Sequence, residues 1–317
     1  MAQAMRIRNT WFSCLLWLAG MAPADAFDLQ AHRGGRGLLP ENTIAAFRNA
    51  MALGVTTLET DMAVTQDGVL VLSHDPHLNP DLVRGPDGKW LDGPGPLIRT
   101  LTVVDLKRYD IGRLNPASKY GAQFSSQKPV DGERFPALAD LFALAGPDMR
   151  FNIETKSDPT KPGNTVPPAA FAKLVVDAVR TAKVERRTTI QSFDWRSLVE
   201  ARKLAPEIET VCLTIDSANY STVSPAPSPW LASFDTKGGL IVQHAKAAGC
   251  AAWSPFWRNV SAANVAEAHG LGLKVIPWTV NEPADMANLI NLKVDGLITD
   301  YPDRGLQVLA QKGLKPR

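Results

Sequence analysis

Along this chain, short strand-like segments alternate with longer segments of helical periodicity. This pattern is typical of parallel βα units and not of all-β or all-α folds. The length of 317 residues suits either two ordinary domains or one barrel. Eight strands with helices between them predict a closed (β/α)8 TIM barrel. The expected strands are residues 29–33, 57–61, 151–156, 188–193, 210–215, 251–255, 274–279 and 296–299.

The connecting helices are expected where apolar residues recur with helical spacing. Asn42 is the expected N-cap of the first helix, because a side-chain oxygen at this position can accept from the first free amides. The expected helices are residues 43–53, 169–182, 195–204, 240–248, 262–269, 284–292 and 306–311.

The segment 69–74 does not fit the count of eight parallel strands. It directly follows Asp67-Gly68, a dipeptide that favours a tight hairpin turn. We therefore expect an antiparallel return from the second strand. This hairpin would bring His74 back to about the level of residue 61, next to the end of the second strand.

A long stretch rich in proline, glycine and charge follows, from about 76 to 146. Loops of this length inside a compact domain usually serve a function. Because the stretch follows the hairpin at the carboxyl end of the barrel strands, where active sites of barrels lie, we expect it to form an inserted lobe over the active site. Helical turns are expected in it near 102–109 and 138–145.

The first 26 residues have the order of a secretory signal peptide. Two arginines precede the apolar stretch 11–20, and small residues lead to an expected cleavage site after Ala26. A membrane anchor is the alternative, but it needs about 20 apolar residues, and proline and aspartate interrupt this run too early. We expect a secreted or periplasmic barrel, 27–317, without stable membrane insertion.

The charge balance argues against a nucleic-acid partner. The net charge is +2, and no basic run is interleaved with aromatic residues. The sequence does not determine the oligomeric state.

Two cysteines remain after the signal peptide, Cys212 and Cys250, each in an apolar strand-like segment. The simplest interpretation is two buried thiols. Because the segments are sequential strands, a disulfide in an oxidising compartment is the alternative, and the sequence alone does not set the geometry that decides it.

Three carboxylates predict a metal site. Glu59 and Asp61 are two residues apart, so on a strand their side chains point to the same face. Glu154 ends the third strand and supplies another oxygen. Oxygen ligands without thiolates suit a hard divalent cation, Ca²⁺ or Mg²⁺. The alternative is that these acids only form salt bridges at strand ends.

Histidines and cations complete the expected chemistry. His32 ends the first strand and His74 ends the hairpin, so the two flank the proposed metal. Two histidines on either side of a cation can accept a proton and donate one, which general acid–base catalysis requires. Arg33 and Lys156 can balance the charge of a phosphate, although they can equally balance the acids. His77, His244 and His269 have no such context.

The motifs that carry these residues resemble the glycerophosphodiester phosphodiesterase family, in its secreted or periplasmic bacterial form. The resemblance covers nearly the whole mature chain. The matching stretches are Ala-His-Arg-Gly-Gly-Arg-Gly-Leu-Leu-Pro-Glu-Asn-Thr at 31–43, Leu-Glu-Thr-Asp at 58–61, Thr-Gln-Asp-Gly at 65–68, Val-Leu-Ser-His-Asp-Pro at 71–76, Asn-Ile-Glu-Thr-Lys at 152–156 and Asp-Gly-Leu-Ile-Thr-Asp-Tyr-Pro at 295–302.

The resemblance implies metal-dependent hydrolysis of small glycerophosphodiesters to glycerol 3-phosphate and an alcohol. It also places Phe193 and Trp278 against the apolar side of the glycerol unit, where core packing is the alternative role. Two other functions remain open. One is a phospholipase D-like or lysophospholipase D-type enzyme on the same barrel, which acts on lysolipids or releases a cyclic phosphate. The other is a solute-binding or surface protein that has kept the fold.

Overall fold

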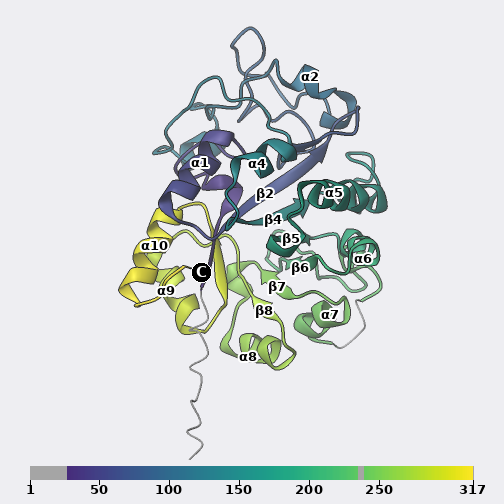
Figure 1. Ribbon diagram of the computed structural model, residues 1–317, viewed down its shortest axis with the longest axis vertical. Coiled ribbons are helices and arrows are strands. Elements are labelled where there is room, and N and C mark those ends of the chain that lie inside the picture. Colours follow the sequence, from purple (N-terminus) through teal and green to yellow (C-terminus); the bar gives the residue numbers. More distant parts are fainter. Residues whose placement is uncertain (1–26, 235–238, 317) are drawn as a thin grey trace, which may run out of the picture.

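The computed structural model describes residues 27–234 and 239–316, so the predicted signal peptide lies outside the described residues. Eight parallel strands form one sheet in the order β8-β7-β6-β5-β4-β2-β1-β9 (Figure 1). The predicted barrel is confirmed. The strands are β1 (Asp28–Ala31), β2 (Thr57–Val64), β4 (Arg150–Thr155), β5 (Thr188–Ser192), β6 (Glu209–Thr214), β7 (Ala252–Pro255), β8 (Lys274–Val275) and β9 (Gly296–Thr299).

Backbone hydrogen bonds between the β8 and β9 segments close the barrel. Asp295 N–H donates to the carbonyl of Val275 at 2.9 Å, and Ile298 N–H donates to that of Pro277 at 3.0 Å. Regular pairing in β8 covers only residues 274–275 of the predicted 274–279. Pro277 has no N–H to donate, so one bond of this ladder is missing.

Helices surround the sheet on its outer side (Figure 1). In α5, Phe171, Val175 and Val179 recur every four residues and are fully buried. Burial of each such side chain stabilises the fold by about 1.5–3 kcal/mol. The helices of this ring are α1 (Ile44–Leu53), α4 (Leu138–Leu144), α5 (Pro168–Ala182), α6 (Trp195–Leu204), α7 (Ile241–Ala247), α8 (Ala262–Gly270), α9 (Pro283–Asn291) and α10 (Pro302–Gln311).

The N-cap predicted for α1 is wrong. Thr43, and not Asn42, caps the helix, since its Oγ1 accepts from Ala46 N–H at 3.1 Å. Asn42 instead adopts a φ of +55° and its amide donates to Asp61 Oδ2 at 3.2 Å. The turn before α1 therefore uses Asn42 to reach the barrel interior.

The predicted hairpin is present. The strand β3 (Leu70–Leu72) runs antiparallel to β2, with Leu72 opposite Met62. Ser73 N–H donates to the carbonyl of Asp61 at 2.9 Å. His74 therefore returns to about the level of Asp61, as expected.

A lobe follows the hairpin and lies at the end of the barrel toward which β2 points (Figure 1). It contains η2 (Ile98–Thr100), α2 (Val103–Leu106) and α3 (Lys119–Gln123). Buried side chains form a separate small core here, which includes Leu78, Val83, Ile98, Leu106 and Ile111. By contrast, α4 at the end of the insertion packs into the main barrel core. Further short 3-10 turns are η1 (His32–Gly34), η3 (Glu185–Arg187), η4 (Pro229–Leu231) and η5 (Trp257–Asn259).

Cys212 and Cys250 form a disulfide, with their Cα atoms 5.9 Å apart. Cys212 belongs to β6 and Cys250 precedes β7, and both side chains are buried. The adjacent parallel strands bring the two sulfurs together, so the structure decides the pairing that the sequence left open.

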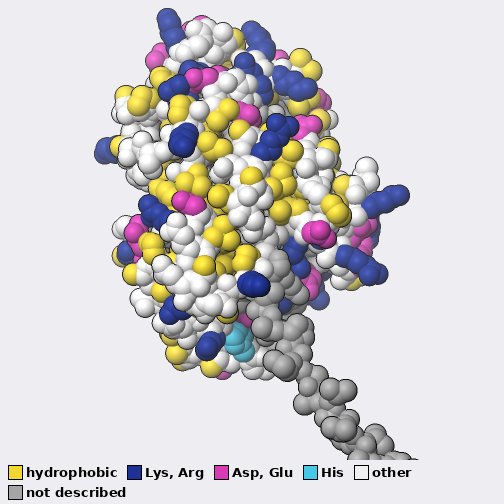
Figure 2. Space-filling model, turned by 60° about the vertical axis from the view of Figure 1, so that its left-hand side comes forward, with side chains coloured by type: hydrophobic (Ala, Val, Ile, Leu, Met, Phe, Trp, Pro, Cys, Tyr) yellow, Lys and Arg dark blue, Asp and Glu magenta, His cyan; other side chains and the backbone are white. Residues whose placement is uncertain are grey.

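Two observations concern the outer surface of the described residues. None of their helices combines the length and the apolar character that crossing a membrane requires. On the face shown in Figure 2, basic side chains are spread among acidic and uncharged ones. This mixed distribution agrees with the small net charge of +2.

Candidate active site

The loop after β1 places two predicted site residues. β1 ends at Ala31, two residues before the predicted end, and His32 and Arg33 lie in the turn η1. Arg33 has a φ of +53°, and Gly34 follows with a φ of +82°. A Cβ on Gly34 would lie 2.9 Å from the Cβ of Ala46, so the tight packing on α1 requires glycine.

The predicted acids lie together inside the barrel. Glu59 and Asp61 point inward from β2, and Asp61 is paired in register with Glu154 on β4. One oxygen from each of the three lies within 4.8 Å of the others, and all three residues are buried. Because β2 extends to Val64, the first two acids lie within the strand and not at its end.

The electrostatics of this triad suit a bound cation. Burial and the neighbouring carboxylates raise the pKa of Glu59 well above its ordinary value. Burial raises the pKa of Glu154 to about 7. Asp61 Oδ1 is buried and accepts no hydrogen bond from the described residues; the Lys156 ammonium lies 3.6 Å away. An all-oxygen donor set with unused acceptor capacity fits Ca²⁺ or Mg²⁺.

The two predicted cations are paired with acids at this site. Arg33 donates from Nη1 to Glu41 at 2.7 Å. Its Nε lies 3.1 Å from Asp61 Oδ2, an ion pair without hydrogen-bond geometry. Lys156 donates to Glu154 at 2.7 Å. These acids therefore hold the side chains of Arg33 and Lys156 at the cavity, where both can also contact a phosphate.

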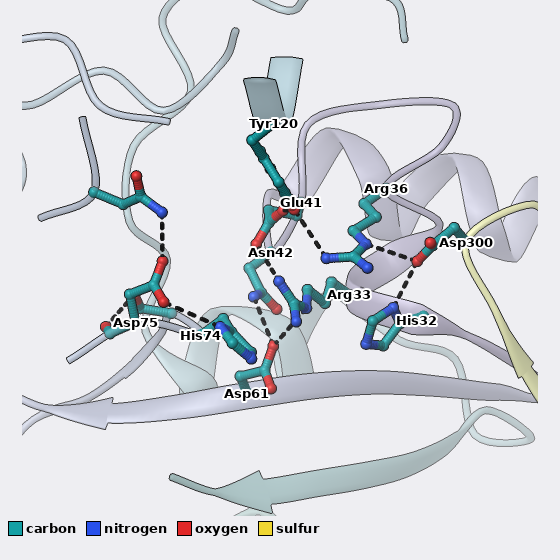
Figure 3. Close-up of polar contacts among 12 residues, drawn as sticks. His32, Arg33, Arg36, Glu41, Asn42, Asp61, His74, Asp75, Tyr120 and Asp300 are labelled. Carbon is teal, nitrogen blue, oxygen red and sulfur yellow. Dashed lines mark hydrogen bonds and ion pairs between the residues drawn. The ribbon is translucent and has the colours of Figure 1, made fainter. Parts of the chain in front are cut away.

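His32 is oriented by a buried carboxylate. Its Nδ1 lies 2.6 Å from Asp300 Oδ1, which also accepts from Arg36 Nε at 2.7 Å (Figure 3). The other oxygen of Asp300 accepts from Asn281 at 2.8 Å. Burial, and then the charge of Arg36, lowers the pKa of His32 to about 4. At neutral pH His32 is therefore neutral, with Nδ1 as the donor to Asp300 and Nε2 as the available acceptor.

His74 has a similar but more open environment. Its Nδ1 lies 3.2 Å from Asp75 Oδ1, and Asn79 donates to Asp75 Oδ2 at 2.6 Å. One third of the His74 side chain, 33%, is exposed. Burial and the charges of Arg33 and Lys156 lower the pKa of His74. Each predicted histidine is thus held at Nδ1 by an aspartate.

One cavity of about 90 Å³ collects these groups at the carboxyl end of the barrel. The rings of Phe193 and Trp278 meet edge to face at 5.2 Å and form its apolar side. Lys156 lies 5.9 Å from the Phe193 ring. The predicted site residues that line the cavity are His32, Arg33, Glu59, His74, Glu154, Lys156, Phe193 and Trp278. Asp61 does not line it, but one of its carboxylate oxygens lies within 4.8 Å of those of Glu59 and Glu154.

A larger cavity of about 440 Å³ opens at the opposite end of the barrel. It is lined by the first residues of several strands, such as Asp28, Thr57 and Arg150. Active sites of this fold lie at the carboxyl end of the strands. The smaller cavity, which holds both predicted catalytic histidines, is therefore the candidate site.

Several residues of the site were not predicted from the sequence. Arg36, Glu41 and Asn42 lie in the glycine-rich run, and their charge and position were available signals. Gln191 donates to Glu59 at 2.8 Å from β5. Asp300 directly follows β9, and an acid at the carboxyl end of a barrel strand is a recognisable signal.

Groups that can hold a divalent cation, balance phosphate charge and transfer protons are together what cleavage of a phosphate diester requires. On a (β/α)8 barrel they define a phosphodiesterase of this fold.

Comparison with known proteins gives the family. The model of the glycerophosphoryl diester phosphodiesterase family matches residues 32–304. A glycerophosphodiester phosphodiesterase from Caldanaerobacter subterraneus subsp. tengcongensis is 32% identical over 286 residues, which cover 89% of this chain and 98% of that protein. The chain belongs to the glycerophosphoryl diester phosphodiesterase family, whose members hydrolyse glycerophosphodiesters. The family that the sequence motifs resemble is confirmed, and its secreted or periplasmic form stays a prediction.

Solved structures agree with this assignment. A structure from Silicibacter pomeroyi that carries the same family name superposes with a TM-score of 0.83 at 33% identity, covering 92% of this chain and 96% of that one. An Oleispira antarctica phosphodiesterase in complex with its product sn-glycerol-3-phosphate has a TM-score of 0.66 at 23% identity, covering 89% and 96%. At this lower identity, the similarity to the Oleispira antarctica structure shows a common fold and no more.

Proposed function

We propose that this enzyme hydrolyses glycerophosphodiesters to glycerol 3-phosphate and an alcohol with a divalent cation and the pair His32 and His74. One observation carries the proposal. A single cavity is lined by both histidines, by Glu59 and Glu154 of the acidic triad, and by the basic side chains of Arg33 and Lys156. Every group that the reaction needs can therefore reach one phosphate.

Glu59, Asp61 and Glu154 would hold the cation. When bound, Ca²⁺ or Mg²⁺ supplies positive charge that stabilises the negative charge developing on the phosphate oxygens. Arg33 and Lys156 add to this charge from the same side of the cavity. Phe193 and Trp278 offer an apolar surface for the carbon atoms of the glycerol unit.

We assign the role of base to His32. Asp300 holds its Nδ1 proton, and its low pKa leaves Nε2 unprotonated at neutral pH. A proton from the glycerol hydroxyl beside the phosphorylated carbon would move to Nε2 as that hydroxyl oxygen bonds to phosphorus, and Asp300 would stabilise the resulting imidazolium. As the bond from phosphorus to the alcohol oxygen breaks, His74 would protonate that oxygen, and its partial exposure lets it exchange protons with solvent. Water would then open the cyclic phosphate with the histidine roles reversed, which gives glycerol 3-phosphate.

We also propose that the enzyme acts outside the cytoplasm, in the periplasm or after secretion. The order of charged, apolar and small residues in 1–26 supports export. The Cys212–Cys250 disulfide supports it independently, because disulfides persist in oxidising compartments.

The test is release of glycerol 3-phosphate from a panel of glycerophosphodiesters. Chelation should abolish the activity, and Ca²⁺ or Mg²⁺ should restore it. Activity that survives exhaustive chelation, or that returns only with a thiophilic metal, would contradict the role of the triad. Preference for lysophospholipids, or a cyclic phosphate as the final product, would assign the lysophospholipase D-type reaction instead.

A further inference from the structure

We propose that the hydroxyl of Tyr120, in the inserted lobe, is a positioning group that holds Arg36 and Glu41 apart and thereby fixes His32 and Arg33 for catalysis. The inference rests on the proposed function of those two residues. It gives the inserted lobe a supporting part in the active site, through Arg36 and Glu41.

Tyr120 lies on α3 and reaches down to the loop that follows β1 (Figure 3). Arg36 Nη1 donates to the Tyr120 hydroxyl at 2.9 Å. The hydroxyl in turn donates to Glu41 Oε2. Burial and the charge of Glu41 raise the pKa of Tyr120, so the hydroxyl keeps the proton that it donates. One oxygen therefore bridges a cation and an anion of the catalytic loop.

Each partner of Tyr120 leads to one functional residue. Arg36 donates from Nε to Asp300, and Asp300 holds His32 Nδ1. Glu41 accepts from Arg33 Nη1 at 2.7 Å, and Arg33 forms an ion pair with Asp61 at the triad. Two chains of contacts thus start at Tyr120 and end at the proposed base and at the triad.

The position between opposite charges explains why the hydroxyl matters. Without it, Arg36 and Glu41 would each lose a partner in a mostly buried place, and they would attract each other directly. A direct pair would draw Arg36 away from Asp300 and Glu41 away from Arg33. The ring itself packs edge to face on Phe124 at 5.3 Å, so a phenylalanine preserves the packing and removes only the bridge.

The lobe also supports this loop through other contacts. Gln127 donates to the carbonyl of Arg36 at 2.7 Å, and Lys128 N–H donates to that of Leu38 at 2.9 Å. These bonds do not involve Tyr120. They keep the loop folded in a Tyr120 variant, so loss of the hydroxyl should loosen residues 33–42 and shift the side chains of Arg36 and Glu41 without unfolding the protein.

The experiment compares Tyr120→Phe with Tyr109→Phe. Tyr109 lies in the same lobe, and its hydroxyl makes no hydrogen bond to described residues. With glycerophosphocholine and saturating metal, Tyr120→Phe should lower kcat by about tenfold or more and leave KM within about twofold. Amide exchange in residues 33–42 should become faster by roughly tenfold. Tyr109→Phe should match the wild type in kcat, in KM and in amide exchange.

The two readouts separate the possible failures. Unchanged amide exchange in Tyr120→Phe would overturn the positioning role. Faster exchange with unchanged kcat would overturn its link to catalysis. If the wild type cleaves none of the diesters, the proposed function fails, and the exchange measurement still decides whether Tyr120 holds the loop.

Discussion

Asp300→Asn is the most informative single change, because it keeps the shape of the side chain and removes its charge. Asp300 accepts three hydrogen bonds, from His32, Arg36 and Asn281, and it is only 1% exposed. An asparagine can present one oxygen to His32 and Arg36. Its amide would then face the Asn281 amide, donor against donor, because the Asn281 oxygen already accepts from the backbone N–H of residue 300.

The magnitude follows from the lost charge. A hydrogen bond to a charged group contributes about 1.5–3 kcal/mol, and this one must stabilise the imidazolium as His32 takes the proton. A loss of about 3 kcal/mol lowers kcat roughly a hundredfold. Since the negative charge of Asp300 raises the pKa of His32, its removal should also lower that pKa further. An acid limb of the rate profile that reports on His32 should therefore move to lower pH.

The assay is the rate of glycerol 3-phosphate release from glycerophosphocholine at saturating metal, measured across pH. Asp303→Asn, in the first turn of α10, is a matched control that removes the same charge outside the cavity. The control should keep most of the activity. If Asp300→Asn is folded and its kcat remains within about threefold of the wild type, Asp300 does not serve His32 as argued.

Three further predictions concern the histidines and the disulfide. In rate assays, His32→Ala and His74→Ala should each lower kcat by about a hundredfold or more, and the double variant should lose little beyond either single variant. If the losses multiply in the double variant, one of the two histidines only positions the substrate. Because the pKa of His32 is about 4 in the folded protein and about 6.5 when unfolded, the unfolded state binds more protons between these values. The contribution of His32 to the unfolding free energy is therefore present at pH 7 and is lost as the pH falls, by about 2 kcal/mol at pH 5. Denaturant unfolding should show that His32→Asn lacks this loss. An equal loss of stability in the wild type and in His32→Asn would contradict the assigned pKa. The Cys212–Cys250 disulfide closes a loop with a sequence separation of 38, so replacing both cysteines by alanine should lower the unfolding free energy by about 2–4 kcal/mol, and a variant as stable as the oxidised wild type would show that the crosslink adds nothing.

Local sequence patterns were sufficient to predict the architecture and much of the candidate site. Alternating strand and helix periods are local, so eight βα units and the barrel could be predicted before the structure. Glu59 and Asp61 share a face because strand side chains alternate with a period of two. The Asp67-Gly68 turn likewise placed His74 beside Asp61, and the register of β2 and β3 agrees.

The partners of these residues could not be predicted from local patterns, because they come from distant segments of the chain. Asp300 and His32 are 268 residues apart, and no local pattern pairs them. The distance between Cys212 and Cys250 depends on how β6 and β7 align. The position of Tyr120 depends on how the lobe folds back over the loop. Periodicity is set by backbone geometry within a few residues, whereas side-chain contacts depend on strand register, barrel closure and the packing of distant segments.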